Sequence, residues 1–232
     1  MDPAKRDRNS CSAGRTWVCQ VLAPLLLLFS AALAAGSPDL DFWQWFVTND
    51  ARIFEAKTAD DPILDQLAAH LHQINPDLTY QIGSVRDGKR EFVISANGIR
   101  SAFPFVEALY ANAPASGHWN WAKYRQRLKR LLAIKLNNIS VSPGDVSFVA
   151  TEEDGKFTVV LYIKGLTERS RSDYEQIAYL FLDQALGEFD VETGVGSIEI
   201  RKADGAGFAM SKPLGQLAGD FDRYRALQAK RS

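Results

Sequence analysis

Two Asp-Gly turns, each between apolar runs, constrain the fold of this chain more than any other feature. Asp-Gly supplies the positive backbone dihedrals that a two-residue β-hairpin loop requires, so each turn predicts a pair of antiparallel strands. The turns are Asp87-Gly88, between residues 78–85 and 90–95, and Asp154-Gly155, between residues 146–151 and 157–163. Two hairpins in one chain indicate a fold in which antiparallel sheet is a major component.

Apolar residues at helical spacing predict helices before, between and after the hairpins. These helices are expected over residues 42–53, 62–74, 103–110, 172–186 and 213–227. In the first helix, Thr48-Asn49-Asp50 offers cap residues that would break it in two. In the fourth, Ser172 and Glu175 form a capping box. The remaining segments are a strand over residues 196–201, a loop over residues 203–212, and residues 119–136, which fit a strand or a helix.

Helices and hairpins alternate without regular βαβ units, which predicts an α+β fold: an antiparallel sheet built from hairpins, with helices packed on it. The two halves share one layout, in which an Asp-Gly-Lys hairpin and an apolar strand precede a helix. A degenerate duplication would produce this layout. Chance would also produce it, because Asp-Gly turns are common. Both explanations stay open at the level of sequence.

An apolar run near the N-terminus, Val18–Ala35, predicts where the protein works. Basic residues precede the run and Ala32-Leu33-Ala34 ends it, which is the pattern of a cleaved secretory signal peptide. We therefore expect residues 1–36 to be a signal peptide and residues 37–232 a single α+β domain, periplasmic or secreted. A membrane anchor formed by residues 18–35 is the alternative, although a span needs about 20 apolar residues.

The formal net charge of −1 gives no general attraction to nucleic acid, whose binders carry a clear basic excess. Cys11 and Cys19 both lie in the predicted leader, so the domain is expected to have no disulfide and no cysteine metal site. The Gly194-x-Gly196 pair lacks the third glycine of a dinucleotide site. We therefore expect no cofactor, no nucleic-acid partner, and membrane contact only through the N-terminal segment if that segment is not cleaved.

Four stretches of the chain share a pattern with one protein family. They are Phe42-Trp43-x-Trp45-Phe46, Ile94-Ser95-Ala96-x-Gly98-Ile99, Arg125-Gln126-Arg127 and Leu182-Asp183-x-Ala185-Leu186-Gly187-Glu188-Phe189-Asp190. In these stretches the chain resembles an uncharacterised bacterial family, a domain of unknown function of about this length. The resemblance implies a strand over residues 119–125 and brings no activity, ligand or catalytic residue. Relatives that begin near the Phe-Trp motif would make this chain a cytosolic member with a wrongly assigned start.

His118 is the strongest candidate for a catalytic group, because a loop histidine beside aromatic residues can act as a base near neutral pH. A small hydrolase would also need a carboxylate, and Glu188 and Asp190 are the candidates. Glu188, Asp190 and Glu192 alternate with apolar residues, so an extended segment would place them on one solvated face. Their spacing matches no calcium or magnesium loop, and we expect no metal. Directly after Gly187, Glu188 is also placed to bond the helix end or a basic neighbour.

Four residues are candidates for binding a macromolecular partner: Trp43, Trp119, Arg125 and Arg127. Trp43 lies off the apolar stripe of its helix, so we expect it at the surface. Residues 123–130 form a basic run interleaved with aromatic residues, which suits an anionic group. A solvated face with salt bridges to acidic segments is the plainer interpretation of the same run.

The sequence therefore favours an exported, non-catalytic domain that binds an unidentified macromolecular partner. No nucleophile motif supports an enzyme. Two alternatives are kept: a small hydrolase that uses His118 with a nearby carboxylate, and a cytosolic member of the resembled family.

Overall fold

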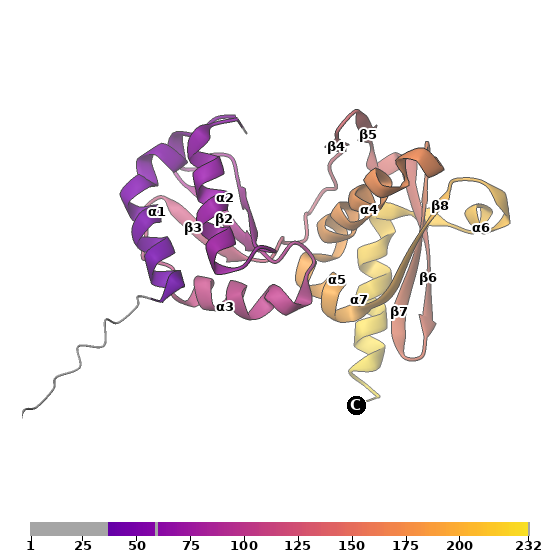
Figure 1. Cartoon of the computed structure of the whole chain (residues 1–232). Coiled ribbons are helices and arrows are strands. Elements are labelled where there is room, and N and C mark those ends of the chain that lie inside the picture. The colour runs from indigo at the N-terminus through magenta and orange to yellow at the C-terminus, as the bar shows by residue number, and fades with distance from the viewer. Residues whose placement is uncertain (1–36, 59, 232) are drawn as a thin grey trace, which may run out of the picture. The chain divides into compact units, whose positions relative to one another are not determined.

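Helices and hairpins alternate along the chain in the computed structural model, which describes residues 37–58 and 60–231 (Figure 1). The helices of these residues are α1 Pro38–Glu55, α2 Pro62–Ile74, α3 Phe103–Ala111, α4 Arg171–Leu186, α5 Glu188–Gly194, α6 Gly205–Ala209 and α7 Leu217–Gln228. The strands are β1 Thr79–Ile82, β2 Arg90–Ser95, β3 Trp119–Lys123, β4 Ile134–Leu136, β5 Ile139–Val141, β6 Val146–Glu153, β7 Lys156–Ile163, β8 Val195–Lys202 and β9 Lys212–Pro213. The expected leader, residues 1–36, lies outside the described residues.

The first large sheet is built on the first predicted hairpin and has the strand order β1-β2-β3. Asp87 and Gly88 have φ values of 51° and 74°, so both central residues have the positive φ of a type I′ turn. β1 and β2 pair antiparallel, with Tyr80 opposite Ile94. β3 then joins parallel to β2, after the chain has passed through α3. The strand implied by the family resemblance is therefore present, as β3.

The second large sheet is built in the same way around the second hairpin, with the strand order β8-β7-β6-β9. Asp154 and Gly155 have φ values of 50° and 73°, which indicates the same type of turn. β6 and β7 pair antiparallel, with Val149 opposite Val160. β8 enters parallel to β7 after α4 and α5. A short two-stranded sheet, β4-β5, lies between the two large sheets in the sequence.

The predicted α+β class is confirmed, with one refinement: both large sheets are mixed rather than purely antiparallel. In each half, a hairpin is followed by a helical crossover and then by a strand parallel to the second hairpin strand. A helical crossover carries the chain back along the sheet, so the next strand runs in the same direction as the previous one. The layout shared by the two halves therefore extends to the order and direction of their strands.

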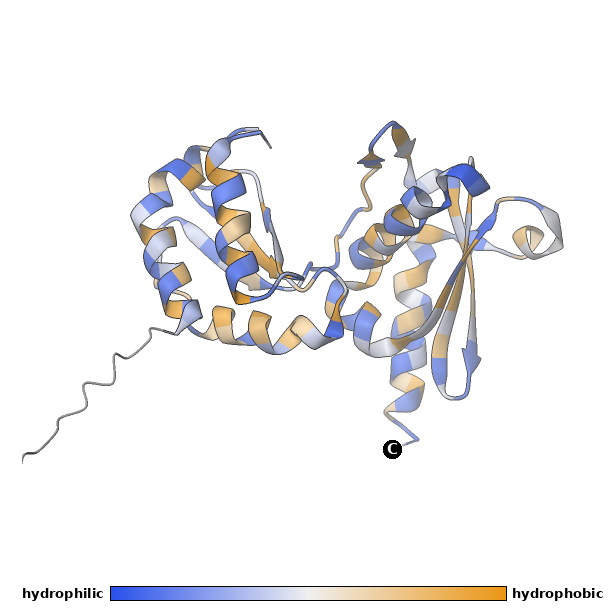
Figure 2. Ribbon diagram, viewed as in Figure 1, coloured by the Kyte–Doolittle hydropathy of each residue, from blue (hydrophilic) through white to orange (hydrophobic). Residues whose placement is uncertain are grey.

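Each large sheet has its own hydrophobic cluster. In the first cluster, Trp43 and Phe46 meet Trp121 edge to face, with ring centroids 4.8 and 5.3 Å away. In the second cluster, the apolar stripe predicted for α4, which includes Ile177 and Phe181, is buried. Figure 2 shows apolar and polar positions alternating along the helices, as amphipathic helices require.

Three local predictions about helices are wrong. α1 is not broken at residues 48–50, because Thr48 and Asn49 donate to carbonyls four residues earlier, at 2.9 and 3.0 Å, inside the continuing helix. α4 begins at Arg171, so Ser172 lies within its first turn and the expected capping box does not form. The segment expected to be a loop, residues 203–212, contains α6.

The acidic segment after Gly187 is a helix, α5, rather than the extended segment that its alternating pattern predicted. Gly187 has φ 88° and ψ 142°, a conformation that separates α4 from α5 and that is open essentially only to glycine. On a helix, residues four positions apart share a side, whereas residues two apart do not. Glu188 and Glu192 therefore share one side of α5, while Asp190 meets Arg225.

Candidate functional site

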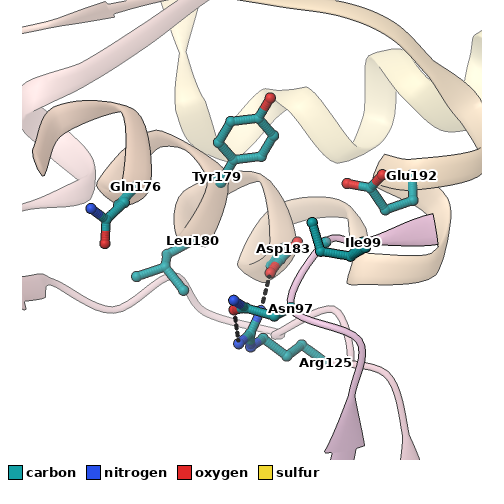
Figure 3. Close-up of a pocket in the computed structure, with 9 residues that line it drawn as sticks. Asn97, Ile99, Arg125, Gln176, Tyr179, Leu180, Asp183 and Glu192 are labelled. Atoms are coloured by element: carbon teal, nitrogen blue, oxygen red, sulfur yellow. Dashed lines mark hydrogen bonds and ion pairs between the residues drawn. The ribbon is translucent and has the colours of Figure 1, made fainter. Parts of the chain in front are cut away.

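A cavity of about 480 Å³, here called the α4 cavity, opens beside α4, and Figure 3 shows the side chains around it. The turn after β2 contributes residues 97–99, and Arg125 follows β3. α5 contributes Glu192. Asn97 and Gly98 have φ values of 53° and 75°, so a tight turn places their backbone at the cavity wall. Residues far apart in sequence therefore meet at one site.

One side of α4 forms the longest wall of this cavity. Gln176, Tyr179, Leu180 and Asp183 are spaced i, i+3, i+4 and i+7, so they lie on the same side of the helix. The core stripe of α4 uses a different side of the same helix. Tyr179 is 46% exposed although it belongs to a buried helix, and Ile99 across the cavity is 40% exposed. The cavity thus has apolar walls that are open to solvent.

Arg125 links Asn97 and Asp183, and these three polar residues are here called the floor of the α4 cavity. Its Nη1 donates to Asp183 Oδ2 at 3.0 Å, and its Nη2 donates to Asn97 Oδ1 at 3.1 Å (Figure 3). The Arg125 and Asp183 side chains are both largely buried, so solvent screens their attraction only weakly. Removing one partner of a buried ion pair costs about 3–5 kcal/mol, because it leaves an uncompensated charge. This pair is therefore part of the framework of the site.

Glu188 bonds the segments that carry this floor and is fully buried. Its Oε1 accepts from the Gly98 backbone at 3.2 Å, and its Oε2 accepts from the Arg125 backbone at 2.9 Å. The Glu188 backbone N–H donates in turn to the Arg125 carbonyl at 2.9 Å. The preceding residue, Gly187, has a φ of 88°, which a residue with a Cβ rarely adopts, although an added Cβ would meet the Arg127 nitrogen at an ordinary contact distance of 3.4 Å. One carboxylate thus fixes two segments that line the cavity.

The carboxyl groups of the site have perturbed pKa values. Burial raises the pKa of Asp183 to about 6, although the Arg125 charge opposes this shift, and the Glu188 charge adds to it. Burial also raises the pKa of Glu192, with a further contribution from Glu188 and an opposing one from Arg100. Burial is the largest cause of both shifts. When all the groups named here are ionised, three carboxylates face two arginines, which leaves an excess of one negative charge. A cationic group would relieve that excess.

The arrangement suits a ligand that combines a positive charge with an apolar stem. The Asp183 and Glu192 carboxylates supply acceptors, and Ile99, Tyr179 and Leu180 supply apolar contact area. Lysine and arginine side chains have this composition, with a methylene stem below a charged head. The volume of the cavity is sufficient for such a side chain. The α4 cavity can therefore accept a basic side chain.

The two tryptophans expected to bind a partner are core residues. Trp43 is only 4% exposed and donates from Nε1 to the Leu109 carbonyl at 2.9 Å, so its expected surface position is wrong. It lies at the edge of the apolar stripe of α1, where α3 covers it. Trp119 is 3% exposed and donates from Nε1 to Asp50. Neither ring is available to a partner in this structure.

The two arginines expected to bind a partner have different surroundings. Arg125 lines the α4 cavity, as described above. Arg127 makes two hydrogen bonds to the Asp222 carboxylate, at 2.9 and 3.0 Å, and lies 3.8 Å from Asp190. Lys123 pairs with Glu107 at 2.6 Å. The basic residues at positions 123–127 therefore form salt bridges, which is the plainer of the two interpretations of the basic run.

His118 is not brought together with the carboxylates proposed for a hydrolase. Its Nε2 lies 2.9 Å from Asp50 Oδ2, and it directly precedes β3. Glu188 contacts Arg125, beyond the other end of β3. A five-residue strand is about 17 Å long, so the two groups lie at opposite ends of it. Asp190 is engaged with Arg127 and Arg225.

Asn97, Tyr179 and Asp183 were not identified as site residues from the sequence. Asp183 had a usable signal, since it lies in the Leu-Asp-x-Ala-Leu-Gly-Glu segment beside Glu188. Tyr179 and Leu180 could also have been noticed. By helical spacing, both are apolar residues that lie outside the apolar stripe of α4. Nothing local indicated that Asn97 would meet Arg125, which is 28 positions away.

The described ranges contain no helix that is both long enough and apolar enough to cross a membrane. Comparison of the chain with protein-family models, with curated proteins and with solved structures gives no match.

Proposed function

We propose that this protein is a non-catalytic interaction domain that binds a partner protein by enclosing one of the partner's basic side chains in the α4 cavity. The observation that carries this proposal is the pairing of acidic groups, Asp183 and Glu192, with the exposed apolar walls of Ile99 and Tyr179. A basic side chain satisfies both features at once, since its stem contacts the walls and its charge meets the carboxylates.

We further propose that the domain works in the periplasm or elsewhere outside the cytosol, as the apolar run Val18–Ala35 indicates. Mass spectrometry of the N-terminus of the native protein tests this. We expect the chain to begin close to residue 36. A native protein that retains Met1 in the cytosol, or that starts close to Phe42, would contradict an exported location and favour the cytosolic alternative.

The small-hydrolase alternative has weaker support, because His118 lies at the opposite end of β3 from Glu188. A screen of esterase, phosphatase and glycosidase substrates tests it directly. If activity is found and a His118→Ala variant loses it, the interaction proposal would need to be replaced. If a detected activity survives that substitution, His118 has no catalytic role.

The binding proposal is tested with a chemically defined probe, Nα-acetyl-arginine amide, and its uncharged citrulline analogue as the control. The two probes have almost the same shape and differ in charge. We expect NMR shift changes at residues 97–99 and 176–183 with the arginine probe, and an affinity at least fivefold lower for the citrulline probe. Equal affinity for both probes, or shift changes elsewhere only, would contradict a cation-binding cavity.

Matched variants then test whether the same cavity binds a protein. Tyr179→Ala and Glu192→Gln change its wall and its charge, whereas Tyr110→Ala and Glu91→Gln change an exposed tyrosine and an exposed glutamate outside the cavity. In quantitative capture, we expect one discrete partner to be reduced about tenfold with the first two variants only. Arg125 and Arg127 are poor test positions, because their ion pairs hold segments of the domain together.

A further inference from the structure

The segment Leu128–Leu136 combines leucines with cations and is not used by the α4 cavity proposal. Its sequence is Leu-Lys-Arg-Leu-Leu-Ala-Ile-Lys-Leu, and no acidic residue occurs anywhere between Arg125 and Asn138. It has no regular structure until β4 begins at Ile134. Most of the remaining basic run, before residue 128, is engaged in ion pairs. The segment therefore differs in composition and in pairing from the chain that precedes it.

Its three cations are exposed and available. Lys129, Arg130 and Lys135 are all exposed, and none of them forms an ion pair or a side-chain hydrogen bond within residues 37–58 and 60–231. The Asp173 carboxylate is engaged by Asn137, at the tip of the β4-β5 hairpin, whose Nδ2 donates to its Oδ1 at 2.9 Å. Asp145, near the end of β5, faces Lys164 instead. Three positive charges on one short segment are thus uncompensated.

Two leucines of the segment are presented to solvent by a fixed backbone. Leu128 and Leu132 are 39% and 56% exposed. The Leu128 backbone N–H donates to the Gln184 carbonyl at 2.8 Å, and the Leu132 backbone N–H donates to Gln184 Oε1 at 2.7 Å. Leu131 packs against the second core instead. The backbone is therefore anchored along α4, beside which β4 also lies (Figure 1), while two leucines remain outside the core.

Two kinds of anionic surface could meet such a segment, and its residue types distinguish them. Single-stranded nucleic acid is bound by cations together with aromatic rings that stack on bases. The aromatic residues that precede the segment in the sequence, Trp121 and Tyr124, belong to the first hydrophobic cluster, and the segment itself has no aromatic residue. Aliphatic side chains beside cations are instead the composition that lies at the boundary of an anionic lipid surface. The observations therefore favour lipid.

We propose that the segment Leu128–Leu136 docks on an anionic lipid surface. Lys129, Arg130 and Lys135 contact the phosphate groups, and Leu128 and Leu132 enter the boundary with the acyl chains. Each cation near such a surface contributes about 1 kcal/mol, which corresponds to roughly fivefold in affinity. The sequence placed membrane contact in the N-terminal segment only, if that segment is not cleaved. The contact proposed here lies within the folded domain, so it is present whether or not the N-terminal segment is cleaved.

The test measures binding of the full chain to phosphatidylcholine vesicles with and without 30% phosphatidylglycerol. We expect Lys129→Gln/Arg130→Gln/Lys135→Gln to weaken binding to the anionic vesicles at least tenfold, and Leu132→Ser alone to weaken it several-fold. The control is Lys57→Gln/Arg86→Gln/Lys89→Gln, which removes the same number of exposed cations elsewhere. Because the N-terminal run is the same in every protein, differences report on the domain. Equal binding of the two triple variants would overturn the proposal.

A residue-resolved measurement separates this segment from the N-terminal run. With a spin-labelled lipid in anionic bicelles, we expect NMR signals of the amides at positions 128–135 to be attenuated. Attenuation that leaves those positions unaffected would overturn the proposal. Binding of a single-stranded oligonucleotide that displaces the vesicles and tolerates Leu132→Ser would also overturn it, in favour of nucleic acid.

Discussion

Glu188 stabilises the α4 cavity although it does not line it. Its two carboxylate oxygens accept from the backbone N–H groups of Gly98 and Arg125, and the side chain is fully buried. A glutamine has only one oxygen, so Glu188→Gln would turn an amide NH₂ towards a backbone donor. We expect this substitution to lower the free energy of unfolding by about 2–3 kcal/mol, as for a buried group left unsatisfied.

Urea denaturation measures this loss, with Glu192→Gln as the control. Glu192 has the same side chain, but it is only partly buried. Its carboxylate accepts no hydrogen bond from residues 37–58 and 60–231. We expect Glu192→Gln to change the free energy of unfolding by less than about 0.5 kcal/mol. Similar effects of the two substitutions would show that the backbone contacts of Glu188 contribute little.

Asp183 gives the stability of the domain a dependence on pH. Burial raises the pKa of Asp183 to about 6 in the folded protein, against the opposing charge of Arg125, whereas an aspartate in an unfolded chain has a pKa near 3.9. Between these values the folded state binds more protons than the unfolded state, so stability decreases as the pH rises. Relative to Asp183→Asn, we expect the free energy of unfolding of the wild type to fall by roughly 1–3 kcal/mol from pH 4 to pH 7.

Urea denaturation at intervals of one pH unit measures this difference. Other titrating groups, including Glu192, are present in both proteins, so most of their contribution cancels when the two are compared. A difference that is independent of pH between 4 and 7, or one that rises with pH, would contradict a raised pKa at Asp183.

Among the elements, the junction between α4 and α5 decides whether the cavity forms. Gly187 has φ 88° and ψ 142°, and its backbone passes close to Arg125 and Arg127. An alanine there is strained because the backbone φ is positive, so we expect Gly187→Ala to destabilise the fold by about 1–3 kcal/mol. Gly215→Ala is the matched control, because an added Cβ meets no atom there within 4 Å. Thermal unfolding compares the two, and equal midpoints would contradict the strain argument.

The elements that the sequence predicts well are those whose signals are local. Asp87-Gly88 and Asp154-Gly155 carry their own dihedral preference, so both hairpins follow from a few residues. α5 was predicted as an extended segment because Glu188, Asp190 and Glu192 alternate with apolar residues in a way that a short helix also permits. Its helical state depends on the break at Gly187 and on the contacts of Glu188 with segments about 60 and 90 residues earlier in the chain.

The candidate site was predicted least well, for the same reason. Arg125 was singled out for binding a partner, whereas the structure pairs it with Asp183. Glu188 was singled out as a catalytic carboxylate or as a residue that bonds a helix end or a basic neighbour, and it accepts from the Arg125 backbone. The pairing of Arg125 with Asp183 joins positions 58 residues apart, and no periodicity reports on such a contact. The expected surface position of Trp43 was wrong. Helical spacing shows which side of α1 is apolar, but it does not show how far α3 covers the residues at the edge of that side.

At the scale of the described domain, two hydrophobic clusters are connected through a small set of contacts. Arg125 follows β3 of the first cluster and pairs with Asp183 of α4, and Phe189 lies 5.7 Å from Phe103 and 5.3 Å from Tyr124 between ring centroids. If these contacts couple the clusters, both should unfold in one transition. Their removal should then separate two transitions.

Tryptophan fluorescence makes this testable, because four of the five tryptophans belong to the first cluster: Trp43, Trp45, Trp119 and Trp121. Fluorescence therefore follows the first cluster, while far-ultraviolet circular dichroism follows both. For the wild type we expect the two urea transitions to coincide. For Arg125→Gln combined with Glu188→Gln we expect the midpoints to differ by at least 0.5 M, since each cluster then unfolds by itself.

The control for this experiment is Arg90→Gln, which removes an arginine that acts within the first half only. Arg90 donates from Nε to the Gly83 carbonyl at 2.7 Å and from Nη1 to the Phe54 and Ala56 carbonyls at 2.6 and 3.0 Å, so it joins the end of α1 to the first hairpin. Its loss should lower both midpoints together, because coupling between the clusters is intact. Coincident transitions in the double variant would mean that other contacts couple the clusters without Arg125 and Glu188. Separate transitions already in the wild type would mean that the two clusters unfold independently. In that second case, a basic ligand that contacts both sides of the α4 cavity would be expected to bring the two midpoints closer together.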